Sequence, residues 1–253
     1  MDDEPTLAAI PLTGGNMEPV VRVGDTVRRV AGEWTPAVHA LLAAVRAAGV
    51  DEVPEPLGLD DSGREIVGFI AGGMLVDAPA RVQWSTTIVE QAGRLLRQVH
   101  EASVPLAHDP GRTWRSPSRE PSEVVCHNDF APYNLVVDGG RLVGAIDFDF
   151  ASPGPRLRDL AYLAYRIAPF AEDAEGFDPE ATSDGETPVD RVRRLVAAYG
   201  ADYPVGEVLG AAAGFLDELA AFTDDRAAAT GRADFVEHAA MYRRDAARLR
   251  SFE

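Results

Sequence analysis

The sequence predicts an α+β protein with two lobes, a small β-rich lobe followed by a larger, mainly α-helical lobe. Two observations support this prediction. Short runs of β-branched residues separated by glycine turns precede Gly72-Gly73, whereas apolar residues recur at helical spacing beyond it. A chain of 253 residues without internal repeats can bury a substantial core. We therefore expect the lobes to comprise residues 1–72 and 73–253.

Turn and capping residues mark the elements of the first lobe. Gly24-Asp25 is typical of a hairpin turn, and Thr35-Pro36 is typical of an N-cap followed by proline at the first helical position. A glycine at position 49 indicates where this helix ends. The expected elements are strands at 20–23, 26–30, 56–59 and 64–70 and a helix at 35–49.

The second lobe is predicted mainly from apolar periodicity. Ile88, Ala92, Leu95, Leu96 and Val99 share one helical face. The expected elements are helices at 85–100, 156–167 and from 188 onward, two more helices ending near 250, a strand at 124–126 and a hairpin formed by 135–137 and 142–146.

Charge and composition exclude some classes of function. The chain has 24 basic and 41 acidic residues, for a net charge of −17, and every basic residue is an arginine. Without lysine, neither a Schiff base nor a phosphate-binding lysine can operate. The acidic surplus argues against a nucleic-acid partner and is compatible with a cationic small molecule.

The single cysteine and the absence of long apolar runs indicate the environment of the protein. Cys126 alone allows no intrachain disulfide and no multi-cysteine metal site, which suits a reducing compartment. The acidic start of the chain is unlike a signal peptide, and no apolar run approaches membrane-spanning length. We expect a soluble, cytoplasmic protein without a membrane partner.

One segment contains the residues for chemistry. His127, Asp129 and Asn134 lie on a loop that follows the strand at 124–126, and the predicted hairpin brings Asp147 back toward this loop. An amide oxygen from Asn134 and a carboxylate from Asp147 are ligands that suit Mg²⁺. Asp129 is then free to accept the proton of a substrate hydroxyl and to direct that oxygen at a γ-phosphate.

This segment resembles the catalytic core of the aminoglycoside phosphotransferase and choline kinase group, small-molecule kinases with a protein-kinase-like fold. The matching motif is His127-x-Asp129-x4-Asn134 followed by Ile146-Asp147. The resemblance covers most of the chain, because Leu95–His100 resembles the family's helix before the catalytic loop and Pro155–Tyr162 resembles the helix after it. It implies Asp129 as the catalytic base, with His127 and Asp159 supporting the loop.

The resemblance also implies how ATP or GTP is bound. It makes 1–72 the nucleotide-binding lobe and 73–253 the catalytic and acceptor-binding lobe. The segment 67–72, with Phe69 and Ile70, becomes the hinge that contacts the nucleotide, and the turn at Gly14 and Gly15 covers its phosphates.

The sequence departs from the family pattern at the phosphate-binding lysine. That lysine belongs on the third strand, where this chain has Arg29, with Arg28 as the alternative; the acidic partner expected on the next helix is replaced by His39. An arginine keeps the charge but differs in reach and geometry. Two roles are expected equally for Asp149, which is either a second metal contact or a local turn partner.

The resulting expectation is a Mg²⁺-dependent kinase that phosphorylates a hydroxyl of a small molecule, with a cationic aminoglycoside as one candidate acceptor. A kinase-like binding or immunity protein with little transferase activity is the alternative, favoured by the absent lysine. A protein kinase is a third reading, opposed by the missing arginine in the His-Asn-Asp loop and the missing activation-segment motifs.

Overall fold

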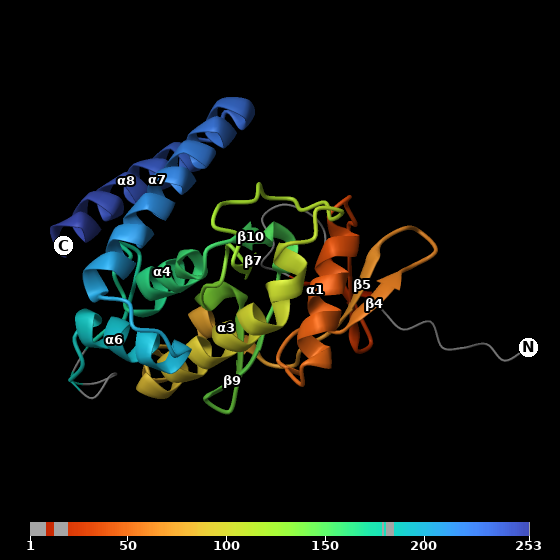
Figure 1. The fold of residues 1–253 in the computed structure, drawn as a ribbon, viewed down its shortest axis with the longest axis horizontal. Coiled ribbons are helices and arrows are strands. Elements are labelled where there is room, and N and C mark those ends of the chain that lie inside the picture. Colours follow the sequence, from red (N-terminus) through yellow and green to blue (C-terminus); the bar gives the residue numbers. More distant parts are fainter. Residues whose placement is uncertain (1–8, 13–19, 179, 181–184, 253) are drawn as a thin grey trace, which may run out of the picture.

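The structure is a computed structural model that describes residues 9–12, 20–178, 180 and 185–252. Its N-terminal part is a five-stranded antiparallel sheet with strand order β1-β2-β3-β5-β4. Figure 1 shows this sheet at one end of the molecule, with helix α1 (Thr35–Ala47) beside it. The strands are β1 (Ala9–Leu12), β2 (Val20–Val23), β3 (Thr26–Arg29), β4 (Pro56–Leu59) and β5 (Glu65–Gly68).

The register of the central strands places two charged residues side by side. Strands β3 and β5 pair antiparallel with Arg29 opposite Glu65. Residues directly opposite each other point to the same face of a sheet, so their side chains can interact. On this face Glu65 contacts His39 of α1, a helix whose Val38, Leu41 and Val45 are completely buried in the core.

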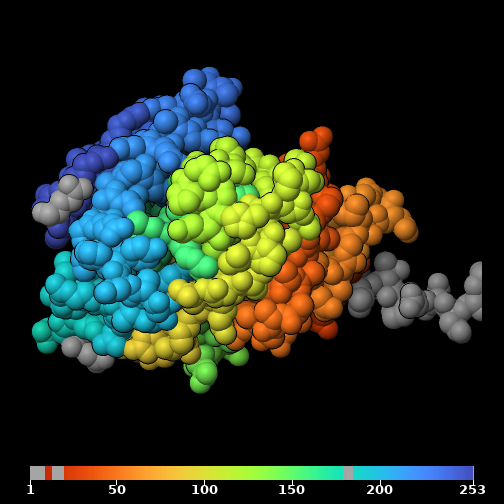
Figure 2. Space-filling view, viewed as in Figure 1, coloured from red at the N-terminus to blue at the C-terminus, as the bar shows by residue number. Residues whose placement is uncertain are grey.

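Helices dominate the C-terminal part. Helix α3 packs against α1, α6 and strand β7, and α4 packs against α7. The long hairpin of α7 and α8 lies at the opposite end of the molecule from the sheet (Figures 1 and 2). The helices are α2 (Ala80–Gln83), α3 (Thr86–Ala107), α4 (Arg156–Ile167), α6 (Pro188–Tyr199), α7 (Val205–Thr230) and α8 (Ala233–Leu249).

Two small antiparallel sheets connect these parts. One has the order β6-β8-β9, from β6 (Gly73–Met74), β8 (Leu135–Asp138) and β9 (Arg141–Ala145). The other pairs β7 (Val124–Cys126) with β10 (Ser152–Gly154). Residues 127–134 lead from β7 of the two-stranded sheet to β8 of the three-stranded sheet. Residues 146–151 lead back from β9 to β10. These two crossings therefore lie next to each other, which brings the motif residues together.

Most expected elements are confirmed, and the differences have local causes. The N-cap of the first helix is Trp34 and not Thr35 as expected, because the Thr35 hydroxyl accepts from the Gly32 N–H (2.9 Å) instead of capping the helix. Helix α3 continues seven residues past His100, because the buried Ser103 ties this last part to β7 by accepting from the Val125 N–H at 2.9 Å.

Strands β1, β6 and β10 were not expected, since they are two to four residues long and lack a periodic pattern. The confirmed architecture is a sheet-rich N-terminal part and a helical C-terminal part; the division at residue 72 stays a prediction. Within the described part of the chain, no helix combines the length and apolar character needed to cross a bilayer.

Candidate active site

The loop at 127–134 is held by a buried carboxylate from α4. Asp159 accepts the backbone N–H of His127 (2.6 Å) and that of Asn128 (2.8 Å). Asn128 has a left-handed backbone (φ 64°), a conformation that costs energy for a residue with a side chain. Its amide compensates by donating to the Phe150 carbonyl and the Ser152 hydroxyl, both at 2.9 Å.

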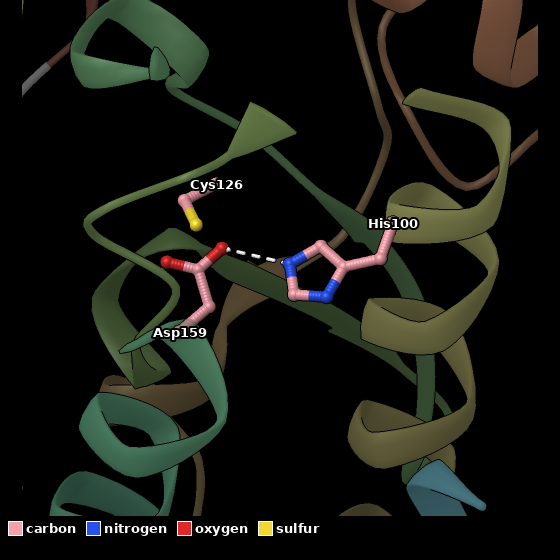
Figure 3. Close-up of side chains that lie close together, drawn as sticks. All are labelled: His100, Cys126 and Asp159. Atoms are coloured by element: carbon pink, nitrogen blue, oxygen red, sulfur yellow. Dashed lines mark hydrogen bonds and ion pairs between the residues drawn. The ribbon is translucent and has the colours of Figure 1, made fainter. Parts of the chain in front are cut away.

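Behind this loop lies a buried cluster of His100, Cys126 and Asp159 (Figure 3). The ring of His100 contacts Asp159 through Nε2 (3.1 Å) and the Tyr199 hydroxyl through Nδ1 (2.8 Å). Burial raises the pKa of the Cys126 thiol well above its usual value, so the sulfur stays protonated. Since a metal requires a thiolate and free donor atoms, this cluster is a structural brace rather than a metal site.

His127 contacts the loop through both ring nitrogens. Nδ1 accepts from the Asp129 N–H (3.2 Å), which leaves Nε2 to donate to the Ile146 carbonyl (3.0 Å). Burial lowers the pKa of His127, so this neutral tautomer is the stable form. These contacts position the loop against the segment that carries Asp147.

Asp129 lies where the loop meets the interior. Its Oδ1 accepts from the Tyr133 hydroxyl, and its Oδ2 accepts from Asn134 Nδ2 at 3.0 Å. Tyr133 also shares a hydrogen bond with the Tyr162 hydroxyl (2.8 Å). Burial raises the pKa of Asp129 to about 7, although the hydrogen bond from Tyr133 opposes this rise. A carboxylate with a pKa near neutrality suits a general base.

Asn134 and Asp147 line one cavity and can together hold a divalent cation. Because Asn134 Nδ2 donates to Asp129, its amide oxygen is the group available for coordination. The Ile146 N–H donates to the Asn134 carbonyl (2.9 Å), which fixes the spacing between the two crossings. Asp147 has a left-handed backbone (φ 65°) and is 45% exposed in its side chain. An oxygen donor pair with open space around it fits Mg²⁺.

Arg29 reaches this position from β3. Its guanidinium contacts Glu65, Asp147 (3.0 Å) and Asp149 (2.7 Å). Burial lowers the pKa of Arg29, but Asp149 and Glu65 outweigh it and raise the pKa overall. Arg28 instead pairs with Asp60 at 3.5 Å.

Glu65 is a site residue that the sequence did not reveal. Its side chain is 1% exposed and binds both Arg29 and His39, the latter at 2.9 Å. The acidic partner of Arg29 therefore comes from the neighbouring strand, and His39 on α1 supports that acid instead of replacing it. The sequence feature that could have indicated its role is a charged residue at the start of the otherwise apolar strand 65–68.

Asp149 contacts two arginines in this structure, and its role as a second metal contact or local turn partner stays a prediction. It pairs with Arg29 and lies 3.5 Å from Arg115. Burial raises its pKa to about 6, an effect that the charge of Arg29 reduces. It acts here as an ion-pair partner that connects the two arginines.

A cavity of about 330 Å³ extends from these carboxylates toward the N-terminal sheet. Phe69 and Ile70 line it, together with apolar residues of both parts, and such a lining suits a planar base. Gly14 and Gly15 lie outside the described residues.

Asp159→Ala should destabilise the fold by roughly 3 kcal/mol or more, because three buried donors lose their acceptor and each costs about 1–3 kcal/mol. Urea unfolding measures this loss, with the exposed Asp61→Ala as the matched control. Equal stabilities of the two variants would contradict the role of Asp159 as a brace.

The raised pKa of Asp129 predicts a pH dependence. A base must be ionised to act, so kcat/KM should fall about tenfold per pH unit below about 7. The hydrogen bond from Tyr133 lowers this pKa. Tyr133→Phe should therefore shift the acidic limb of the pH–rate profile to higher pH. A pH–rate profile of both proteins tests this; a limb that stays in place would refute the assignment.

Comparisons with known proteins relate this site to a family and to a fold. Residues 111–204 match the model of the phosphotransferase enzyme family. The chain is 33% identical over 179 residues to the trifolitoxin immunity protein of Rhizobium leguminosarum bv. trifolii. That match covers 68% of this chain and 65% of the relative, just under two thirds of the relative's length.

Solved structures share the fold across almost the whole chain. The GDP complex of a mutant aminoglycoside 2′-phosphotransferase-IIIa has a TM-score of 0.65 at 14% identity, covering 97% of this chain and 93% of the other. Plasmodium vivax ethanolamine kinase has a TM-score of 0.64 at 13% identity, covering 97% and 83%. The protein therefore has the two-lobed protein-kinase-like fold. Its predicted resemblance to the aminoglycoside phosphotransferase and choline kinase group is confirmed.

Proposed function

We propose that the protein is a phosphotransferase that moves the γ-phosphoryl group of ATP or GTP to a hydroxyl of a small molecule. One observation carries this proposal. The catalytic loop separates two cavities, one lined by Asn134 and Asp147 and the other by Asp129. A transferase needs such a division, since donor and acceptor must reach the reacting centre from different sides.

The nucleotide base would occupy the apolar cavity beside Phe69 and Ile70, in the hinge segment of the N-terminal lobe. Arg29, held by Glu65, would supply positive charge next to the phosphates in place of a lysine. Asn134 and Asp147 would hold Mg²⁺, which neutralises charge on the phosphate oxygens. The Gly14-Gly15 turn is proposed as the cover of the phosphates.

Asp129 would perform the proton transfer. The acceptor hydroxyl gives its proton to the carboxylate while its oxygen bonds to the γ-phosphorus, and the bond to the bridging oxygen breaks to release the nucleoside diphosphate. The hydroxyl of Tyr133 now occupies one oxygen of Asp129, so the acceptor must share or replace this contact. His127 and Asp159 keep the loop in position and take no part in the transfer.

The test is nucleotide binding followed by transfer. Mg-ATP or Mg-GTP at about 100 times its Kd should stabilise the protein by about 2.7 kcal/mol, a rise of roughly 5–10 °C in Tm. Asp147→Ala should abolish this rise, whereas the exposed Asp138→Ala should retain it. Absence of any shift with either nucleotide would refute the proposal.

The trifolitoxin immunity relative favours a second candidate, a kinase-like protein that confers immunity by binding with little transferase activity. The ion pairs of Arg29 with Asp147 and Asp149 agree with this candidate, because they occupy the groups that a nucleotide complex needs. Incubation with labelled nucleotide and a panel of hydroxylated amines and hydroxylated acids separates the two. Labelled product supports the transferase, and ligand binding without product supports the alternative.

A further inference from the structure

A second cavity of about 310 Å³ opens on the other side of the catalytic loop. Asp129 and Asn128 form its inner wall. Phe215, Leu219 and Phe222 of helix α7 line its outer wall, and Phe222 is 51% exposed. We call it the acceptor-side cavity, a name that rests on the proposed transferase function.

The charge of this cavity is opposite to that of the whole chain. Among its described lining residues, Arg115, Arg119 and Arg158 are basic, and Asp129 and Glu218 are acidic. The chain as a whole carries 41 acidic residues against 24 basic ones. The described lining therefore carries one more cation than anion, although Arg115 also lies 3.5 Å from Asp149.

Arg119 and Arg158 compete for a single carboxylate oxygen. Glu218 Oε2 lies 2.7 Å from Arg119 Nη2 and 2.9 Å from Arg158 Nη2. Arg158 Nε donates to the Asn128 amide oxygen at 2.6 Å. Two guanidinium groups on one oxygen leave one positive charge unmatched, and a guanidinium is well shaped to bind a carboxylate or a phosphate.

Aromatic rings accompany these cations. The guanidinium of Arg158 lies 4.1 Å from the ring centre of Phe215, and that of Arg115 lies 4.8 Å from that of Phe150. Rings at these distances hold the guanidinium groups by cation–π contacts, and the exposed Phe222 of the same cavity offers a face to an apolar ligand.

We propose that the acceptor-side cavity binds an alcohol that carries an anionic group, carboxylate or phosphate, on an apolar and preferably aromatic body. The anion is bound by Arg119 and Arg158, and the body packs on Leu219 and Phe222. The hydroxyl is then directed at Asp129. Among the described residues of the lining, a polycationic acceptor finds Glu218 and Asp129 as counter-charges, and Glu218 is already shared by two arginines.

Three aryl alcohols with the same skeleton test the charge preference. They are 4-(hydroxymethyl)benzoate, the neutral 4-(hydroxymethyl)benzamide and the cationic 4-(hydroxymethyl)benzylamine; 4-(hydroxymethyl)benzylphosphonate distinguishes a phosphate-like group from a carboxylate. Transfer from Mg-ATP gives kcat/KM for each, and calorimetric titration without nucleotide gives Kd. We expect the better of the two anionic alcohols to have a kcat/KM at least about tenfold higher than that of the amide, and a correspondingly lower Kd. The amine should have the lowest kcat/KM and the weakest binding.

Two variants of the ion pair should act in opposite directions. Arg119→Gln removes a cation and should lower the preference for the anion about tenfold, whereas Glu218→Gln removes the competing carboxylate and should raise it. A structural role for the pair would lower activity in both variants, because both break the same contact.

The outcomes separate this inference from the proposed function. Anion binding that depends on Arg119, without transfer to any compound, refutes the transferase but supports the anion site. Preferred binding or transfer of the amine overturns the inference and leaves the transferase intact. Failure of both anions to bind at millimolar concentration also overturns the inference, whatever the nucleotide shift shows.

Discussion

Asp129→Asn should lower the rate of phosphoryl transfer about 10²–10⁴-fold, the range that a positioned general base contributes. The asparagine keeps the size of the side chain and can still accept from Tyr133, but it cannot take up a proton. Since Asp129 lies on the acceptor side of the loop, Mg-nucleotide binding should change little. Steady-state kinetics and a nucleotide titration measure the two effects.

The matched control is Asp138→Asn in the exposed hairpin between β8 and β9, which should transfer at the normal rate. Stability offers a second check. Asp129→Asn removes a charge that burial disfavours but also loses one of the two hydrogen bonds that the carboxylate accepts, so its stability should change by no more than about 1 kcal/mol. Full transfer activity in Asp129→Asn would show that another group accepts the proton.

Arg29→Met should have the largest effect on stability at the site, a loss of about 3–5 kcal/mol, because it leaves a buried charge without its partner. The Glu65 side chain is 1% exposed, and in this variant His39 would be its remaining ion-pair partner among the described residues. Asp147 and Asp149 would both lose the cation that they share. Chemical unfolding measures this loss. Nucleotide affinity should also fall, since the charge beside the phosphates is removed.

Two further variants separate the structural role of Arg29 from its role in binding. Arg29→Met combined with Glu65→Gln removes both charges and should recover part of the stability without recovering nucleotide affinity. Arg29→Lys keeps the positive charge as a compact ammonium without the planar fork and reach of the guanidinium. It should bind nucleotide better than Arg29→Met. Equal nucleotide affinity in Arg29→Lys, Arg29→Met and the unchanged protein would show that Arg29 does not contact the phosphates.

Sequence reasoning was most successful where the signal is local. The hairpin around Gly24, the helix at 156–167 and the loop at 127–134 depend on turn residues, periodicity and a fixed spacing within one segment. The spacing of His127, Asp129 and Asn134 was sufficient to place them on one loop, because a short loop leaves its residues few positions. The end of α3 was misjudged because a tertiary contact, from Ser103 to β7, extends it.

Contacts between segments that are distant in the sequence could not be predicted from such local signals. Glu65 is 36 residues from Arg29, and only the antiparallel register of β3 and β5 brings them together. Arg119 and Arg158 meet Glu218 because α4 packs against α7, an arrangement that no local pattern encodes. The net charge of the chain suggested a cationic acceptor, whereas the folded chain gathers arginines around the acceptor-side cavity.

By itself, the sequence determined the fold class, the catalytic-loop motif and the absence of lysine chemistry. Each of these depends on residue type and spacing within a continuous segment. Only the tertiary structure decided that Arg29 is held by Glu65, and that the surroundings of Asp129 are cationic and aromatic. Charge acts through space and over a few ångströms, so its effect at a site depends on which segments pack together.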